Sequence, residues 1–302
     1  MVWPSVAGAH NWLPEAYSPK TKLVYIPVIE LGMRMSDANI DLKHFQLPDD
    51  RSMAAAVNID FDIKNDPLQG TGALVAWNPV TQKAAWKVFH PTYVDGGVMA
   101  TAGNLVFQGT VEGAFSAYDA RNGRPLWSFA THVPMIAAPI SYLVNGRQYV
   151  TVLTGLGALS ALAGSSIEKY GIDPNSQARR VLTFAIGGKA RLPPAPPIRL
   201  NAVDDPDFRL DTEAAKAGEA IYARNCMLCH GISAISGTHA PDLRRSKAPQ
   251  SAEAFASIVH NGILVANGMP QFDELTAEQR DELRQYIREQ AQKLRSMQRE
   301  TK

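Results

Sequence analysis

The sequence predicts a multidomain protein in which an all-β domain is followed by a small all-α domain. Three observations support this prediction. The chain has 302 residues, and a single hydrophobic core usually stops growing near about 250 residues. The first half alternates apolar and polar residues between Gly and Asn turns, whereas the C-terminal third carries apolar residues at helical spacing. Between these parts, residues 192–207 read LPPAPPIRLNAVDDPD, which is typical of an extended linker.

These composition changes set the expected boundaries. We expect the β domain at residues 1–160, a linker at 161–209, the α domain at 210–295 and a short tail at 296–302. The chain is 45% hydrophobic and 20% charged with a formal net charge of +1. This balance indicates neither disorder nor a nucleic-acid partner. Apolar runs such as Leu105–Phe107 are far shorter than the roughly 18 residues of a membrane span, so no transmembrane segment is expected.

The β domain contains an internal repeat. Strands are predicted at 23–26, 105–107 and 149–153. The segments VAWNPVTQKAAW, ending at Trp86, and SAYDARNGRPLW, ending at Trp127, match at an offset of 41 residues. A repeat of about 40 residues with four strands is typical of a propeller blade. In each copy Asn78 or Asp119 would close a hairpin, and the tryptophan would dock between adjacent blades. A β-sandwich with coincidentally spaced tryptophans is the alternative.

The two cysteines of the chain form one motif. Cys226 and Cys229 are followed at once by His230, in the sequence CMLCH. CxxCH is the attachment pattern of haem c, in which both thiols bind the haem covalently and the histidine is an axial iron ligand. A redox-active pair, a zinc half-site and a buried structural pair are the alternatives. A zinc site would need a second Cys/His pair at ligand spacing, which the sequence lacks.

Met269 is the candidate for the sixth iron ligand. It lies 39 positions after His230 in the sequence NGMPQF, where the flanking Gly and Pro exclude a helix. Met/His ligation suits electron transfer rather than oxygen chemistry. An ordinary core methionine is the alternative reading. His239 and His260 are predicted to lie at the surface or near the haem propionates rather than on the iron.

Three helices are predicted around this motif. The first leads into CMLCH and carries Ala214, Gly218, Ile221 and Tyr222 on one face. The second begins after Ser251, carries Phe255, Ile258 and Val259, and ends before Gly262. The third begins with a capping box formed by Thr276 and Gln279, followed by an apolar stripe of Leu283, Tyr286, Ile287 and Leu294.

This C-terminal third resembles the small class I c cytochromes. Gly218 and Tyr222 on the first helix and Tyr286 on the last resemble the crossed-helix contact of that family. The segment HAPDL, with Pro241, resembles the stretch whose proline lies against the axial histidine.

The whole chain resembles the C-terminal part of quinohaemoprotein alcohol dehydrogenases. The resemblance rests on three segments of the β domain: GAHNWLPEAYSPKTKLVYIP, GGVMATAGNLVFQGTVEGAFSAYDARNGRPLWSF and VPMIAAPISYLVNGRQYVTVLTGLG. In that family an eight-bladed propeller binds pyrroloquinoline quinone (PQQ) and calcium, and a c cytochrome follows it. The resemblance implies a periplasmic enzyme that oxidises a primary alcohol to an aldehyde and passes electrons to the haem.

The resemblance also implies a quinone pocket. Asn11 and Trp12 of the HNW motif would lie against PQQ, and the backbone around Val98 and Met99 would border the same pocket. His10 has an ordinary reading as a satisfied polar core residue, and the pair Gly96 and Gly97 as a tight strand entry.

The sequence lacks several features that the family resemblance would lead us to expect. The family's adjacent-cysteine disulfide has no counterpart, because the haem takes both cysteines. No segment corresponds to the catalytic aspartate, its lysine partner or the calcium ligands. The carboxylates of an acidic insertion are predicted to be solvated rather than metal-bound: Asp37, Asp41, Asp49, Asp50, Asp60, Asp62 and Asp66.

The length of the β domain accommodates about three blades of the eight. An eight-blade ring cannot close with these alone, so we expect an upstream propeller half as partner. The N-terminal sequence MVWPSVAGAHNW does not read as a secretory signal, as expected if the chain begins within the propeller.

Two functions are compatible with these features. The chain is either the haem-bearing C-terminal portion of a PQQ- and calcium-dependent alcohol dehydrogenase acting on a small alcohol, or a stand-alone periplasmic cytochrome with a non-catalytic β docking module. In both, electrons would leave for another cytochrome, a copper protein or a quinone.

Overall fold

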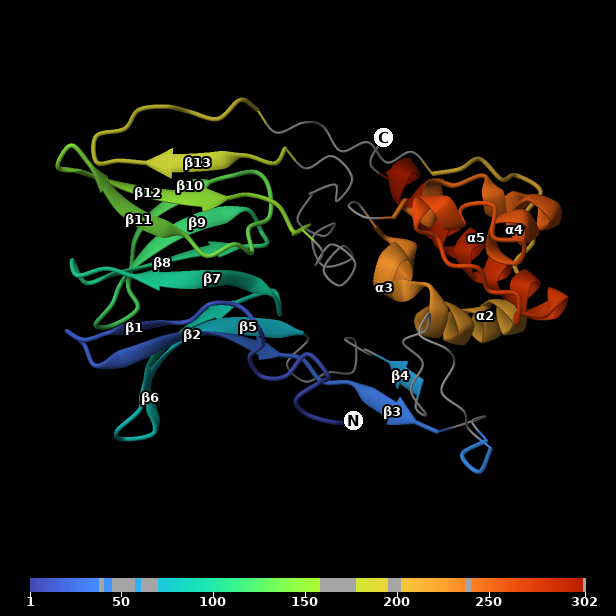
Figure 1. Cartoon of the computed structure of the whole chain (residues 1–302), viewed down its shortest axis with the longest axis horizontal. Helices are drawn as coiled ribbons and strands as arrows, with labels where there is room; N and C mark the ends of the chain where they lie inside the picture. Colours follow the sequence, from blue (N-terminus) through green and yellow to red (C-terminus); the bar gives the residue numbers. More distant parts are fainter. Residues whose placement is uncertain are drawn as a thin grey trace.

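The computed structural model describes residues 1–37, 41–44, 58–60, 70–157, 178–194, 202–236 and 240–300. The three larger sheets gather on one side of the molecule and the helices on the other, with the small ribbon of β3 (Arg34–Ser36) and β4 (Asn58–Asp60) on the side of the helices (Figure 1). The predicted order, propeller-like sheets followed by a helical domain, is confirmed.

The strands form three sheets of propeller type and one small ribbon. The first sheet has the order β1 (Ala16–Ser18), β2 (Leu23–Glu30), β5 (Thr71–Asn78) and β6 (Lys83–His90). The second contains β7 (Asp95–Ala100), β8 (Leu105–Thr110), β9 (Ala114–Asp119) and β10 (Pro125–Ala130), and the third contains β11 (Ile140–Val144), β12 (Arg147–Leu153) and β13 (Val181–Phe184). All neighbouring strands within these sheets are antiparallel.

Apolar cores lie between successive sheets. Tyr25 and Leu74 of the first sheet pack with Val106 of the second, and Phe115 of the second packs with Val152 of the third. Each sheet therefore buries a face against the next, as blades of a propeller do.

The repeated tryptophans join adjacent sheets, as predicted. Trp86 of β6 donates its Nε1–H to the carbonyl of Ala120 at 3.1 Å, and its ring lies against Gly123 in the turn after β9. Trp127 of β10 contacts Phe184 of β13 edge to face, with ring centroids 5.3 Å apart.

The turns that precede the tryptophans are closed by the predicted Asn and Asp. The side-chain oxygen of Asn78 accepts from the backbone N–H groups of Val80 and Thr81 at 2.9 and 3.1 Å. Asp119 accepts from the backbone N–H of Arg121 at 2.9 Å in the same way. Such Asx turns stabilise a hairpin reversal.

The helical domain has four α-helices and four short 3₁₀ helices among the described residues. They are α2 (Thr212–Asn225), α3 (Met227–His230), η3 (Ile232–Ala234), η4 (Leu243–Arg245), η5 (Ala248–Gln250), α4 (Ala252–Val259), η6 (Val265–Asn267) and α5 (Ala277–Glu300). The predicted caps form: Ser251 accepts from the N–H of Ala254, and Thr276 and Gln279 bond each other's backbone N–H groups reciprocally.

The structure differs from the sequence prediction at three places. Within the predicted linker 161–209, β13 pairs with β12, and residues 203–208 lie on the helical domain. Helix α5 continues through Glu300, into the predicted tail. Within the acidic insertion, β3 (Arg34–Ser36) pairs with β4 (Asn58–Asp60), and this ribbon lies beside α2 (Figure 1).

None of the helices in the described part of the chain has both the length and the apolar character needed to cross a membrane.

Candidate haem c site

The CMLCH motif occupies a bend between two helices. Cys226 ends α2, where its N–H donates to the carbonyl of Tyr222 at 2.8 Å, and it also begins α3. The N–H of His230 donates to the carbonyl of Cys226 at 2.9 Å. One turn of helix thus places both thiols and the imidazole close together.

The His230 ring is buried and held in one orientation. Its Nδ1 lies 2.9 Å from the carbonyl oxygen of Pro241, to which a protonated Nδ1 donates. The Nε2 atom then carries the lone pair and is available to a metal. Burial lowers the pKa of His230, against smaller opposite effects of the Pro241 carbonyl and of Asp242, and this favours the neutral imidazole that a metal requires.

The two thiols differ in environment. Cys226 packs against the helical core, and burial, together with the charge of Cys229, raises the pKa of Cys226 to about 12. Cys229 is exposed, and the two cysteines form no disulfide. Both sulfurs therefore remain available for thioether bonds.

These groups line one pocket with Met269. The pocket is lined by Cys226, Cys229, His230, Met269, Pro270 and Phe272, among others. Met269 lies outside any helix and follows Gly268, whose φ of +88° is left-handed and favours glycine. Two thiols, an imidazole and a thioether on one mostly apolar pocket fit the covalent and axial bonds of haem c.

The crossing of α2 and α5 supports the motif. Tyr222 donates its hydroxyl hydrogen to the carbonyl of Gly231 at 2.7 Å, and its ring lies 5.0 Å from that of Tyr286. Burial raises the pKa of Tyr222 well above its usual value, so the phenol stays protonated and can donate. At Gly218, an added Cβ would lie 2.0 Å from the backbone oxygen of Glu282, so only glycine permits this close crossing.

A buried ion pair beside His230 was missed by sequence reasoning. Asp242 follows Pro241 directly and receives two hydrogen bonds from the guanidinium of Arg244, at 2.9 and 2.6 Å. Both side chains are almost fully buried. Three charged residues among the four of DLRR suggest an exposed turn, and nothing in the local pattern indicates that Asp242 and Arg244 are buried.

Of the four residues assigned to the quinone pocket, Asn11 and Trp12 lie in the loop before β1, and Val98 and Met99 lie in β7. The N–H of Val98 donates to the carbonyl of Pro14 at 2.8 Å, two residues after Trp12. The side chain of Val98, however, is in the core between the first two sheets, and Met99 packs into the core between the second and third. Asn11 bonds backbone groups of its own loop, and Trp12 is exposed. The assignment of these residues to PQQ remains a prediction.

The other histidines and aspartates considered in the sequence analysis do not lie in the haem pocket where the structure describes them. The Nδ1 of His10 lies 2.8 Å from the carbonyl of Pro27, and His260 ends α4 near Arg280. Asp37 and Asp41 are exposed, and Asp60 lies in β4. His239, Asp49, Asp50, Asp62 and Asp66 lie outside the described residues. Within the described ranges, no group of three or more His, Cys, Asp or Glu side chains is arranged to hold a metal ion.

Two families match parts of the chain. The family described as "Cytochrome C oxidase, cbb3-type, subunit III" matches residues 213–287. The family described as "Glucose/ethanol/alcohol dehydrogenase, beta-propeller domain" matches residues 69–150.

Several longer proteins match nearly the whole chain. It is 39% identical over 291 residues to the quinohemoprotein alcohol dehydrogenase ADH IIB of Pseudomonas putida, covering 95% of this chain and 41% of that protein. The solved structure of ADH-IIG from P. putida superposes with a TM-score of 0.81 at 36% identity, covering 98% of this chain and 43% of that one. The quinohemoprotein alcohol dehydrogenase of Comamonas testosteroni superposes with a TM-score of 0.70 at 31% identity, over 96% of this chain and 42% of that one.

Fold and site together define a class, in which propeller-type sheets are followed by a c-type cytochrome domain. The chain is homologous to the C-terminal part of the quinohaemoprotein alcohol dehydrogenases. It spans about two-fifths of the length of these relatives.

Proposed function

We propose that this chain is the electron-exit portion of a PQQ-dependent alcohol dehydrogenase and that it carries one covalent haem c. The observation that carries the proposal is the single pocket shared by Cys226, Cys229, His230 and Met269. The homology of the chain to the haem-bearing end of quinohaemoprotein alcohol dehydrogenases supports it.

Each residue of the pocket would have one role. Cys226 and Cys229 would hold the haem through thioether bonds, and His230 and Met269 would be the axial ligands. When bound, haem c supplies a one-electron redox couple. The Pro241 carbonyl fixes the orientation of His230 by accepting from its Nδ1. As the sixth ligand, Met269 would close the iron to outside ligands, which favours electron transfer.

The alcohol chemistry would belong to the complete protein. The family resemblance implies that the catalytic aspartate, its lysine partner and the calcium ligands would come from an upstream propeller part. Asn11 and Trp12, with the backbone at Val98 and Met99, would contribute one edge of the quinone pocket. The substrate would be a small primary alcohol, and the family resemblance supports a periplasmic location.

An exposed sheet face supports an upstream propeller partner. Ile140 of β11, Leu153 of β12 and Val181 of β13 are more than half exposed, on a sheet whose other face is buried against the second sheet. A propeller blade buries both faces. The stand-alone cytochrome with a docking module is not favoured, because the relatives that match both parts of the chain are longer dehydrogenases.

The haem ligation is tested by expressing the chain in cells with c-type haem maturation. We expect one haem per chain that resists denaturation, and its loss in the Cys226→Ala/Cys229→Ala variant. Met269→Leu should lower the midpoint potential and allow cyanide to bind, because Met/His ligation raises the potential and closes the iron. Met227→Leu is the matched control, since Met227 lines the same pocket. Equal behaviour of both methionine variants would show that Met269 is not the ligand.

The place of the chain in the enzyme is tested by haem reduction under anaerobic conditions. The haem-loaded chain is given PQQ, calcium and ethanol, with and without the upstream propeller part of a relative such as ADH IIB. We expect reduction only when the upstream part is present. Rapid reduction without it would show that this chain alone holds a working quinone site. No reduction in either case, with normal reduction by dithionite, would favour the stand-alone cytochrome.

A further inference from the structure

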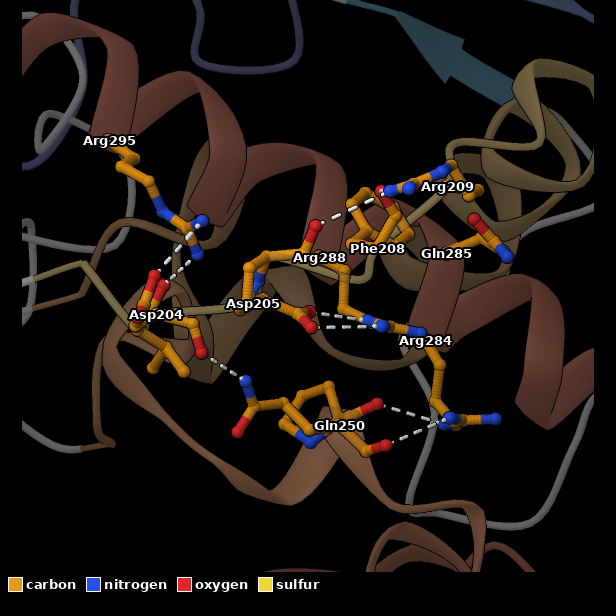
Figure 2. Close-up of polar contacts among 12 residues, drawn as sticks. Asp204, Asp205, Phe208, Arg209, Gln250, Arg284, Gln285, Arg288 and Arg295 are labelled. Atoms are coloured by element: carbon orange, nitrogen blue, oxygen red, sulfur yellow. Dashed lines mark hydrogen bonds and ion pairs between the residues drawn. The ribbon is translucent and has the colours of Figure 1, made fainter.

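A short segment before the first helix of the haem domain is fixed to α5. Residues 203–208 are here called the strap. Figure 2 shows its Asp204, Asp205 and Phe208 beside the α5 arginines Arg284, Arg288 and Arg295. Asp205 receives two hydrogen bonds from the guanidinium of Arg288, at 2.7 and 3.1 Å. The same guanidinium lies over the ring of Phe208 at 4.4 Å. One planar cation is therefore shared by a carboxylate and an aromatic ring from the strap, a geometry that suits arginine and not lysine.

Further contacts hold the beginning of the strap. Arg295, two turns further along α5, donates to the backbone oxygen of Val203. Its ion pair with the carboxylate of Asp204, at 3.4 Å, is exposed to solvent and adds little. The amide of Gln250 donates to the backbone oxygen of Asp204 at 2.6 Å. Because the backbone is bonded at successive residues, the strap cannot slide along the helix without losing several bonds at once.

The strap also contacts the loop that holds the iron ligand. The N–H of Val203 donates to the backbone oxygen of Arg244 at 3.3 Å. The guanidinium of Arg244 is paired with Asp242 inside the domain, and the preceding Pro241 accepts from the Nδ1 of His230. A continuous chain of bonded groups therefore runs from α5 through the strap to the imidazole.

We propose that residues 203–208 position the proximal haem ligand. The strap lies in the segment that comes from the propeller sheets, but its contacts make it part of the wall behind His230. It holds the Pro241–Arg244 loop in place, and thereby the hydrogen bond that orients the ring and strengthens its basicity. This inference rests on the proposed haem ligation by His230.

The clamp between Asp205 and Arg288 can be tested against a neighbouring carboxylate. Asp205→Asn is compared with Asp204→Asn in the full haem-loaded chain. Both remove one negative charge from adjacent positions, but the Asp204 side chain is 88% exposed and that of Asp205 is 15% exposed. We expect Asp205→Asn to raise the midpoint potential of the haem relative to Asp204→Asn, because a loosened Nδ1–H bond makes the histidine a weaker electron donor.

The variant Arg288→Lys tests the positioning of the strap separately from any change in charge. It removes the planar fork without changing the net charge, so a rise in potential here has no simple electrostatic origin. The potentials are measured in buffer where optical spectra show that every variant is folded with unchanged axial ligands, so a loss of stability alone does not alter the result.

The outcomes distinguish this inference from the proposed function. A higher potential in Asp205→Asn and Arg288→Lys, with Asp204→Asn close to wild type, supports the positioning role. Equal potentials in all four proteins overturn it and leave the haem assignment intact. A wild-type chain that binds no haem, or binds it without His230, overturns the proposed function and this inference with it.

Discussion

Gly218 shows how one position can determine the geometry of the haem domain. The backbones of α2 and α5 approach so closely here that a methyl group would overlap the main chain of Glu282. Backbone cannot rotate away as a flexible side chain can, so the helices would have to separate. Separation would move Tyr222, which donates to Gly231 just after the haem motif.

We expect Gly218→Ala to destabilise the haem domain by about 1–3 kcal/mol, the usual range for overpacking. Urea unfolding followed by haem absorbance measures the change. Lys216→Ala is the control, because it introduces the same residue at an exposed position of the same helix, and it should stay within about 0.5 kcal/mol of wild type. A stable Gly218→Ala variant would mean that the helices cross at a greater distance than described.

Asp95 is a buried acid that the proposed electron transfer does not use. It lies at the start of β7, accepts from the N–H of Val111 at 3.2 Å and from the hydroxyl of Thr92 at 3.3 Å. Burial, and then the charge of Glu112, raises the pKa of Asp95 well above 3.8. Its Oδ2 lies 3.9 Å from the Nδ1 of His90, whose pKa burial lowers.

The raised pKa predicts a pH dependence of the β domain. The folded state holds the proton more tightly than the unfolded state, so stability falls as pH rises from 3.8 toward the folded pKa of Asp95. Asp95→Asn should remove this fall while keeping the bond from Val111. His90, with its lowered pKa, gives the opposite slope below pH 6.5, so the variant must be compared with wild type at each pH. Parallel urea-unfolding curves for the two proteins between pH 4 and 7 would refute the prediction.

At the scale of elements, α5 begins with the capping box predicted from the sequence. Thr276 accepts from the N–H of Gln279 at 3.2 Å, and the Gln279 side chain accepts from the N–H of Thr276 at 2.9 Å. Thr276→Ala should cost about 1 kcal/mol of stability, because a helix N–H loses its partner. Thr276→Ser keeps the hydroxyl and should retain most of this stability. Thermal unfolding monitored by circular dichroism compares the two, and equal losses would exclude a capping role.

Elements with a local signal were predictable from the sequence. The capping box, the Asx turn at Asn78 and the helix through Tyr222 depend on residues a few positions apart. The CMLCH motif is equally local, and its spacing alone indicated the site. The docking of the two tryptophans between sheets was also predictable. The repeat at an offset of 41 residues indicates two equivalent contacts, although each joins residues that are distant in the sequence.

Elements that depend on distant partners were missed. Strand β13 pairs with β12 about thirty residues earlier. Its residues Val181–Phe184 favour a strand, but the run is only four residues long and its partner is distant in the sequence. The sequence predicts a linker at the strap because prolines flank it, whereas Arg288, the partner of Asp205, lies 83 positions later. Arg284, Arg288 and Arg295 are spaced to lie along one side of a helix. This spacing does not show which distant segment of the chain the arginines will bind.

At the scale of the molecule, the third sheet has one buried face and one open face. Leu153 and Val181 are directly opposite each other on β12 and β13, with 54% and 67% of their surfaces exposed. Tyr142 and Tyr149 stack on the same sheet, with ring centroids 5.7 Å apart. An apolar sheet face of this kind marks a surface that is normally covered, which agrees with a chain that spans two-fifths of its longer relatives.

Without its covering partner, this face should cause the chain to associate with itself. We expect the mass of the purified chain in light scattering to rise with concentration. The double variant Leu153→Glu/Val181→Lys should suppress the rise, because it replaces the facing apolar pair by an opposite-charge pair without changing the net charge. The control Ile186→Glu/Val80→Lys makes the same exchange at two exposed positions outside the sheets, 95% and 86% exposed, and should behave as wild type. If both double variants lower the mass equally, association depends on general surface hydrophobicity, and the open face of the third sheet is not the contact.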